Sequence, residues 1–156
     1  MSTSPITLNL PDADATAALG RSLAAHLVPG DILLLEGDVG AGKTHLARAL
    51  IQSILIEAED VPSPTFTLVQ VYDTTRGPLW HADLYRLSDS SEVEELGLTE
   101  AFATAICLVE WPDRLADTPA GALRLCIHPS GAGRSVELSW QSERWATRMK
   151  QGIAHD

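Results

Sequence analysis

One octapeptide constrains the fold of this chain more than any other feature. Residues 37–44 read Gly-Asp-Val-Gly-Ala-Gly-Lys-Thr and match the pattern G-x-x-x-x-G-K-[ST] at every fixed position. Residues 31–37 form a nearly continuous apolar run, typical of a strand buried on both faces. Residues 43–55 follow with apolar side chains at helical spacing. A strand, a glycine-rich loop and a helix in this order predict a phosphate-binding P-loop within an α/β fold.

The residue types in this loop suit a triphosphate. Gly37, Gly40 and Gly42 allow a tight, partly left-handed backbone whose N–H groups can approach phosphate oxygens closely. The helix that begins at Lys43 points its positive end at the same oxygens. Lys43 adds a full charge for the β and γ phosphates, and the Thr44 hydroxyl is placed to bind magnesium. The alternative is a glycine-rich turn that matches the pattern by chance.

The loop by itself selects neither the base nor the reaction. Guanine-binding P-loop proteins usually carry an Asn/Thr-Lys-x-Asp run late in the chain, which supplies a carboxylate for the base. No such run occurs in this sequence, where Lys150 is followed by Gln151 and Gly152. The sequence therefore favours ATP over GTP.

Two carboxylates beside apolar strands are candidates for a magnesium site. Glu110 ends the apolar run 105–109, and Asp83 lies within residues 81–86. Magnesium takes oxygen ligands, commonly including a carboxylate near the end of a neighbouring buried strand. An acid among apolar neighbours is costly unless a cation or hydrogen bonds compensate it. The alternative for each is an ordinary edge carboxylate beside water or an arginine.

Residues 63–65, Ser-Pro-Thr, lie between the P-loop helix and the next strand, where other P-loop proteins keep a segment that senses the γ phosphate. Thr65 would supply the sensing hydroxyl, although a proline-fixed turn entering a strand is the simpler interpretation. Four further residues near these motifs are explained mostly by structural roles: His45, His81, Trp111 and Arg134.

The remaining pattern predicts one domain, residues 1–156, with a mixed sheet and flanking helices. Strands are expected at residues 6–10, 31–37, 66–73, 79–86, 105–111, 123–127 and 136–140. Helices are expected from residue 11 to 28 and over residues 43–55, 91–98 and 145–153. Two antiparallel hairpins should result, one turning at residues 74–77 and one at a glycine-rich turn after residue 127.

The charge balance argues against direct nucleic-acid binding. The chain carries 21 Asp and Glu against 11 Lys and Arg, and its two lysines are Lys43 and Lys150. Because nucleic-acid binders cluster basic residues, any involvement with RNA is expected to run through a partner protein. With no apolar run near the roughly 20 residues of a membrane helix and no secretory signal before Arg21, we expect a cytoplasmic protein. Cys107 and Cys126 are expected to be buried thiols, and no zinc-ligand spacing occurs.

Four segments together resemble the bacterial TsaE family, also called YjeE. They are Gly-Ala-Gly-Lys-Thr at 40–44, Ser-Pro-Thr-Phe-Thr-Leu-Val at 63–69, His-Ala-Asp-Leu-Tyr-Arg-Leu at 81–87 and Leu-Val-Glu-Trp-Pro at 108–112. The resemblance spans the chain from about residue 10 to residue 140. It implies an ATPase that uses ATP and magnesium. It also implies that, with the partner proteins TsaB and TsaD, the ATPase is required for the threonylcarbamoyl modification of the adenosine 3′ of the anticodon.

The resemblance also implies which residues form the site. The phosphates of ATP or ADP would be held by Gly40, Ala41, Gly42, Lys43 and Thr44. Magnesium would be bound by Thr44 and Glu110. Hydrolysis would depend on Lys43, Thr65, Asp83, Glu110 and Trp111, with residues 63–65 acting as a switch.

The positions that flank the nucleotide base in this family correspond to Ala13 and Arg134. His45 stands where the family usually has a second threonine, so its backbone N–H remains for the α phosphate but a side-chain hydroxyl contact does not. Ala82 replaces a usual aromatic residue, which implies a change in packing.

Two other functions stay open beside a slow, partner-dependent ATPase. A small-molecule kinase would pass the γ phosphate to an acceptor other than water, but kinases usually need a mobile lid that bears arginine. Residues 112–122 offer only Arg114 for that purpose. A non-hydrolysing switch would instead use ATP to order residues 63–66 for a partner.

Overall fold

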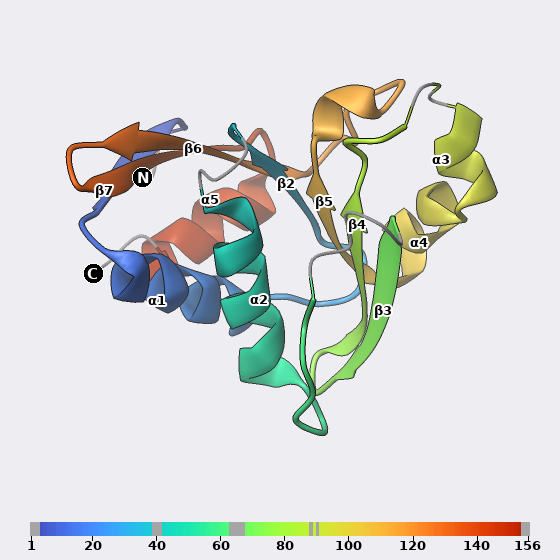
Figure 1. Ribbon diagram of the computed structural model, residues 1–156, viewed down its shortest axis with the longest axis horizontal. Helices are drawn as coiled ribbons and strands as arrows, with labels where there is room; N and C mark the ends of the chain where they lie inside the picture. The colour runs from blue at the N-terminus through green and yellow to red at the C-terminus, as the bar shows by residue number, and fades with distance from the viewer. Residues whose placement is uncertain (1–3, 39–41, 63–67, 88, 90, 154–156) are drawn as a thin grey trace.

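The structure is a computed structural model that describes residues 4–38, 42–62, 68–87, 89 and 91–153. Within these residues one seven-stranded sheet has the order β1-β7-β6-β2-β5-β4-β3 (Figure 1). The strands are β1 Ile6–Leu10, β2 Ile32–Glu36, β3 Val69–Thr74, β4 Gly77–Asp83, β5 Ile106–Glu110, β6 Leu123–Ser130 and β7 Gly133–Ser139. Strands β6, β2, β5 and β4 pair in parallel, and the outer pairs are antiparallel. The predicted mixed sheet and both predicted hairpins are confirmed.

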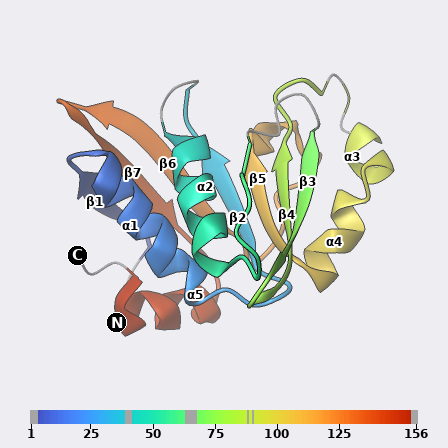
Figure 2. The ribbon, with the colours of Figure 1, turned by 60° about the horizontal axis from the view of Figure 1, so that its bottom comes forward.

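Helices cover both faces of the sheet (Figure 2). One face carries α1 Ala13–Ala24, α2 Lys43–Ile54, α5 Glu143–Arg148 and the turn Met149–Ile153 that continues α5. The other face carries α3 Ser91–Glu95 and α4 Leu98–Thr104, over the β5-β4-β3 side. A short 3₁₀ turn, Pro112–Arg114, follows β5. Among the described residues, no helix is long and apolar enough to cross a membrane.

Strand β2 explains why the sequence has an unbroken apolar run before the glycine-rich loop. Successive side chains of a strand point to opposite faces of the sheet. Leu33 and Leu35 therefore pack in the cluster with α1 and α2, whereas Ile32 and Leu34 pack in the cluster with α3 and α4. All four are buried, so β2 is the centre of two hydrophobic cores.

The start of β2 also anchors the carboxyl-terminal helix. Asp31 is fully buried, and its Oδ2 accepts hydrogen bonds from the Val28 N–H and from Arg148, each at 2.8 Å. Arg144 lies 3.4 Å from the Asp31 Oδ1 atom. A buried carboxylate needs such partners to offset its loss of hydration. The arginines of α5 thus hold that helix against the beginning of the central strand.

Several predicted boundaries are wrong for local reasons. Strand β4 ends at Asp83 rather than at residue 86, because the Asp83 Oδ1 atom accepts a hydrogen bond from the Tyr85 N–H at 2.9 Å and turns the chain. The expected helix at residues 91–98 is shorter, ending at Glu95 before Gly97, whose φ is 81°, and the helix α4 at Leu98–Thr104 was not expected. Strand β3 begins at Val69, and the expected strand residues before 68 lie outside the described residues.

The two cysteines differ in environment. Cys107 is buried as expected, and burial raises the pKa of its thiol to about 12. Cys126 is only half-buried, which corrects the expectation for this residue. Its side chain lies on the face of β6 opposite Leu125, and the helices of that face, α3 and α4, cover the other end of the sheet.

The crossing of α1 and α2 depends on a glycine. A Cβ atom on Gly20 would lie 2.7 Å from the Leu46 carbonyl oxygen and 3.2 Å from the Leu50 nitrogen. The two backbones therefore approach more closely than an alanine would permit. At the start of α1, Asp12 caps the helix by accepting a 2.8 Å hydrogen bond from the Ala15 N–H, so α1 begins at Ala13 rather than at the expected residue 11.

Gly20→Ala tests this close approach. In an unconstrained helix the change would stabilise the protein by about 1 kcal/mol. Here we expect a loss of roughly 1–3 kcal/mol in the free energy of unfolding, because the new methyl group overlaps backbone atoms of α2. Urea unfolding measures the change, and Ala18→Gly on the exposed face of α1 reports the helix-propensity effect alone. A Gly20→Ala protein as stable as the wild type would contradict the close packing.

Candidate phosphate-binding site

The carboxyl ends of β2, β5 and β4 meet the first turn of α2 at one edge of the sheet (Figure 1). In the parallel registers, Glu110 of β5 lies opposite Leu35 of β2 on one side and opposite Asp83 of β4 on the other. The neighbouring helix α2 begins at Lys43, after Gly42 with φ of 111°. Strand pairing thus places two carboxylates next to the amino terminus of a helix.

Lys43 lies at the centre of this edge. Its side chain is 5% exposed, and its ammonium group donates a hydrogen bond to the Gly37 carbonyl oxygen. The Lys43 Nζ atom also lies 3.5 Å from the centroid of the Trp111 ring. Burial lowers the pKa of Lys43, and the carboxylates of Glu110 and Asp83 oppose that shift. The charge is held at the mouth of the loop by weak partners that an anion could replace.

Glu110 contacts two polar side chains of the site. It is 2% exposed, and its Oε1 atom accepts a hydrogen bond from the Thr44 hydroxyl at 3.1 Å. Its Oε2 atom lies 2.6 Å from the His81 Nε2 atom. Asp83, 4% exposed, lies beside it in the sheet. Two buried carboxylates next to a single ammonium group provide oxygen ligands for a cation and a potential proton acceptor.

Trp111 has an unusual backbone. Its φ and ψ are 59° and 54°, a left-handed conformation that costs free energy for a residue with a bulky side chain. The conformation turns the chain directly after Glu110 and brings the ring over Lys43. The ring also contacts Tyr85, with centroids 4.8 Å apart and an interplanar angle of 48°. The strained backbone of Trp111 therefore lies at the position where its ring covers the Lys43 ammonium group.

A concavity of about 390 Å³ lies beside the first turn of α2. Its walls come from the start of α1, the start of α2 and the β6–β7 turn: Asp12, Ala13, Thr16, Gly42, His45, Ala132, Gly133 and Arg134. His45 Nε2 lies 3.0 Å from the Ala13 carbonyl oxygen, which joins two of the walls. A Cβ atom on Gly133 would collide with the backbone of Leu10 and Pro11, so glycine is needed to bring the third wall close.

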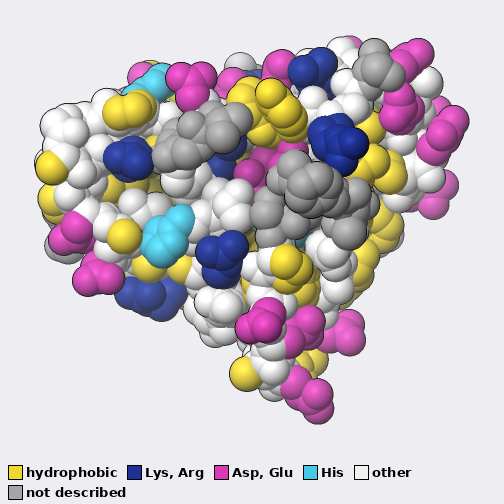
Figure 3. All heavy atoms as spheres, viewed as in Figure 1, with side chains coloured by type: hydrophobic (Ala, Val, Ile, Leu, Met, Phe, Trp, Pro, Cys, Tyr) yellow, Lys and Arg dark blue, Asp and Glu magenta, His cyan; other side chains and the backbone are white. Residues whose placement is uncertain are grey.

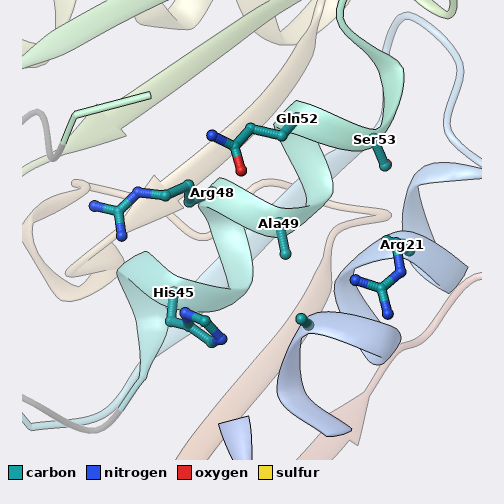
Figure 4. Close-up of a pocket in the computed structure, with 7 residues that line it drawn as sticks. Arg21, His45, Arg48, Ala49, Gln52 and Ser53 are labelled. Atoms are coloured by element: carbon teal, nitrogen blue, oxygen red, sulfur yellow. The ribbon is translucent and has the colours of Figure 1, made fainter. Parts of the chain in front are cut away.

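A second hollow, of about 340 Å³, lies between α1 and α2 on the other side of His45 (Figure 4). Arg21 and Arg48 both line it, but Figure 4 shows their guanidinium groups on opposite sides of the hollow. Arg48 instead donates a 2.9 Å hydrogen bond to the Val61 carbonyl oxygen. The two arginines therefore do not form a shared anion site.

The structure brings most of the sequence-predicted residues into two adjoining groups. Around the sheet edge lie Lys43, Thr44, Asp83, Glu110 and Trp111. Around the concavity lie Ala13, Gly42, His45 and Arg134. Three predicted site residues, Gly40, Ala41 and Thr65, lie outside the described residues, as do the other two residues of the 63–65 segment.

Sequence reasoning gave His81 a mostly structural role and assigned no role to Tyr85. In the structure, His81 contacts Glu110, and the Tyr85 ring contacts the Trp111 ring at a tilted angle of 48°. A signal for His81 was present, because it occupies a buried-face position between Leu79 and Asp83 where an apolar residue would be expected. Tyr85 lies after the end of β4 and offered no periodic signal.

The chain has the P-loop NTPase fold. Strand β2 leads into the glycine-rich sequence and then into helix α2, which begins at Lys43, and the neighbouring parallel strand β5 ends in the carboxylate of Glu110. The family profile described as "Threonylcarbamoyl adenosine biosynthesis protein TsaE" matches residues 10–136. The chain belongs to the TsaE family.

Individual relatives agree with this family. The tRNA threonylcarbamoyladenosine biosynthesis protein TsaE of Bacillus subtilis is 40% identical over 146 residues, which cover 92% of this chain and 90% of the relative. The Rickettsia felis protein of the same name is 42% identical over 106 residues, which cover 68% of this chain but only 62% of the relative. The crystal structure of Bacillus subtilis YdiB matches with a TM-score of 0.75 and 27% identity, covering 97% of this chain and 95% of that chain.

The coupling of Lys43 to Glu110 can be measured in the nucleotide-free protein. Lys43 is expected to titrate below 10.5, because burial disfavours its charged form. Glu110→Gln should lower the pKa of Lys43 further, since the carboxylate partly offsets burial. With only two lysines in the chain, ¹³C NMR of dimethylated lysines resolves the titration.

Glu100→Gln is the matched control, since Glu100 lies in α4 on the opposite face of the sheet. It should leave the Lys43 titration unchanged. A Lys43 midpoint at or above 10.5 would show that burial does not lower its pKa, and equal shifts in the two variants would show that the charge of Glu110 does not act on Lys43.

Proposed function

We propose that this protein is a single-domain, magnesium-dependent ATPase that supports threonylcarbamoyladenosine formation in tRNA, 3′ of the anticodon, together with TsaB and TsaD. The observation that carries the proposal is the convergence of Lys43, Thr44, Asp83 and Glu110 at the amino terminus of α2. The tRNA role is supported by membership of the TsaE family, whose relatives are named for this biosynthesis.

The chain's own contribution to phosphate binding is charge and exposed N–H groups. The first turn of α2 offers backbone donors that lack partners within the helix. Lys43 would exchange the Gly37 carbonyl oxygen and the face of Trp111 for phosphate oxygens. Since both present partners are uncharged, the exchange favours a polyanion.

The donors present fit magnesium. Two neighbouring ligand atoms of an octahedral magnesium ion, each about 2.0–2.1 Å from the metal, are roughly 2.9 Å apart. The Thr44 hydroxyl oxygen and Glu110 Oε1 lie 3.1 Å apart and are both hard oxygen donors. Thr44 and Glu110 would therefore hold the ion, and bound magnesium would stabilise the negative charge on the β and γ phosphates.

Asp83 and Trp111 complete the proposed hydrolytic site. Asp83 lies opposite Glu110 and is almost fully buried, a position suited to orienting the attacking water. The Trp111 ring, which Tyr85 contacts, covers Lys43 and would limit access of bulk water. The concavity lined by Ala13, His45 and Arg134 would receive the base. Thr65 is proposed as the residue that senses the γ phosphate.

The surface supports a division of labour between this protein and its partners. Figure 3 shows acidic side chains gathered at the lower tip and the upper right edge of the face that bears the site. The helix α3 alone carries Glu92, Glu94 and Glu95. A chain with net charge −10 would be repelled by RNA, so contact with tRNA is proposed to run through TsaB and TsaD.

Replacing each of the two lysines tests the proposal directly. Lys43→Ala should lower phosphate release by about 100-fold or more, because it removes the charge that stabilises the transition state. Lys150→Ala removes the same charge outside the site and should leave the rate near that of the wild type. The measurements are phosphate release and repeated tRNA modification cycles, with and without TsaB and TsaD.

Multi-turnover modification that survives both Lys43→Ala and Glu110→Ala would refute the proposed role. Transfer of the γ phosphate to a small molecule, with no free phosphate, would indicate a kinase instead. Tight ATP binding without turnover in the complete assembly would indicate a switch that does not hydrolyse ATP.

A further inference from the structure

His81 occupies a position that the fold would normally give to an apolar side chain. It lies in the middle of β4 and is fully buried. On the same face, Leu79 precedes it and Leu108 of β5 pairs with it in register. An imidazole buried at such a position costs free energy unless a hydrogen bond compensates it. Its presence therefore calls for a specific polar partner.

The partner of His81 is the carboxylate of Glu110. The Nε2 and Oε2 atoms are 2.6 Å apart, and both side chains are almost completely buried. A carboxylate accepts hydrogen bonds, so Nε2 carries a proton and donates. The other ring nitrogen, Nδ1, is buried and has no hydrogen-bond partner among the described residues. Among the described residues, His81 thus has one polar contact, and that contact is with Glu110 of the site.

The contact divides the two oxygens of Glu110 between two neighbours. His81 holds Oε2, whereas the Thr44 hydroxyl donates to Oε1 at 3.1 Å and lies 3.5 Å from Oε2. A carboxylate held at only one oxygen can rotate about its terminal torsion, which has a broad energy well. The His81 contact limits that rotation and leaves Oε1 next to Thr44.

We infer that His81 is a positioning residue, which holds Glu110 so that its Oε1 atom and the Thr44 hydroxyl together face a divalent cation. The inference rests on the proposed function. Hydrogen bonds to a ligating group orient it, and their loss typically lowers metal affinity about 10–100-fold. His81 would not touch the nucleotide, because Glu110 and Thr44 lie between them.

The direct readout is metal binding rather than turnover. Mn²⁺ affinity of the ADP-saturated protein, followed by electron paramagnetic resonance, should fall about 10–100-fold in His81→Phe. His81→Gln keeps an N–H donor near the place of Nε2 and should restore much of that affinity. ADP affinity without a divalent cation should be unchanged in both variants, because it depends on Lys43 and the loop. Tyr72→Phe is the matched control, since the buried Tyr72 hydroxyl also has no hydrogen-bond partner among the described residues.

The outcomes separate this inference from the proposed function. If Glu110→Gln leaves Mn²⁺ affinity unchanged, the proposed metal role of Glu110 fails, and the inference fails with it. If Glu110→Gln weakens Mn²⁺ binding but His81→Phe does not, only the inference fails. Equal losses in His81→Phe and His81→Gln, or a matching loss of metal-free ADP binding in His81→Gln, would show a merely structural role.

A double variant completes the test. If His81 acts through Glu110, adding His81→Phe to Glu110→Gln should weaken Mn²⁺ binding no further. Additive losses would overturn the inference, because His81 would then influence the metal by another route. Should His81→Phe fail to fold, His81→Gln is compared with Tyr72→Phe instead. If His81→Gln loses both stability and metal-free ADP binding while Tyr72→Phe loses neither, the inference is overturned.

Discussion

The parallel pairing of β5 with β2 and β4 is the constraint on which the site depends. It places Glu110 beside Asp83 on one side, and on the other beside the strand that leads into the glycine-rich loop. Because a parallel register shift of one residue would turn every side chain to the opposite face, the buried leucines of β2 also hold the carboxylates in place. The strand register that packs the core thus also sets the geometry of the site.

Burial then decides how the charged groups of the site behave. Lys43, Asp83 and Glu110 are each at most 5% exposed, so their charges interact through protein rather than through bulk water. They compensate one another in part, and the left-handed backbone of Trp111 adds a further local cost. Such unfavourable local features are expected to gather at sites that bind a ligand. The proposed ligand here is a polyanion with a divalent cation.

Sequence patterns correctly predicted those helices and strands whose formation depends on residues close by in the sequence. The apolar run of β2 and the β3–β4 hairpin were read correctly, because their causes lie within a few residues. The end of β4 was misplaced, since the turn at Asp83 competes with apolar residues that seemed to continue the strand. Leu84 and Leu87 are buried as that pattern suggests, but they pack in the cluster with α3 and α4 from a turn.

The sequence by itself determined the glycine-rich loop, the mixed α/β fold and the membership of the family, because each is recorded in short segments with fixed residue types. Only the tertiary structure decided that His81 contacts Glu110, and that the Tyr85 ring contacts the Trp111 ring. Those contacts join residues far apart in the chain, and they follow from strand register and helix crossing. Both depend on the free energy of packing the whole core, which no short segment contains.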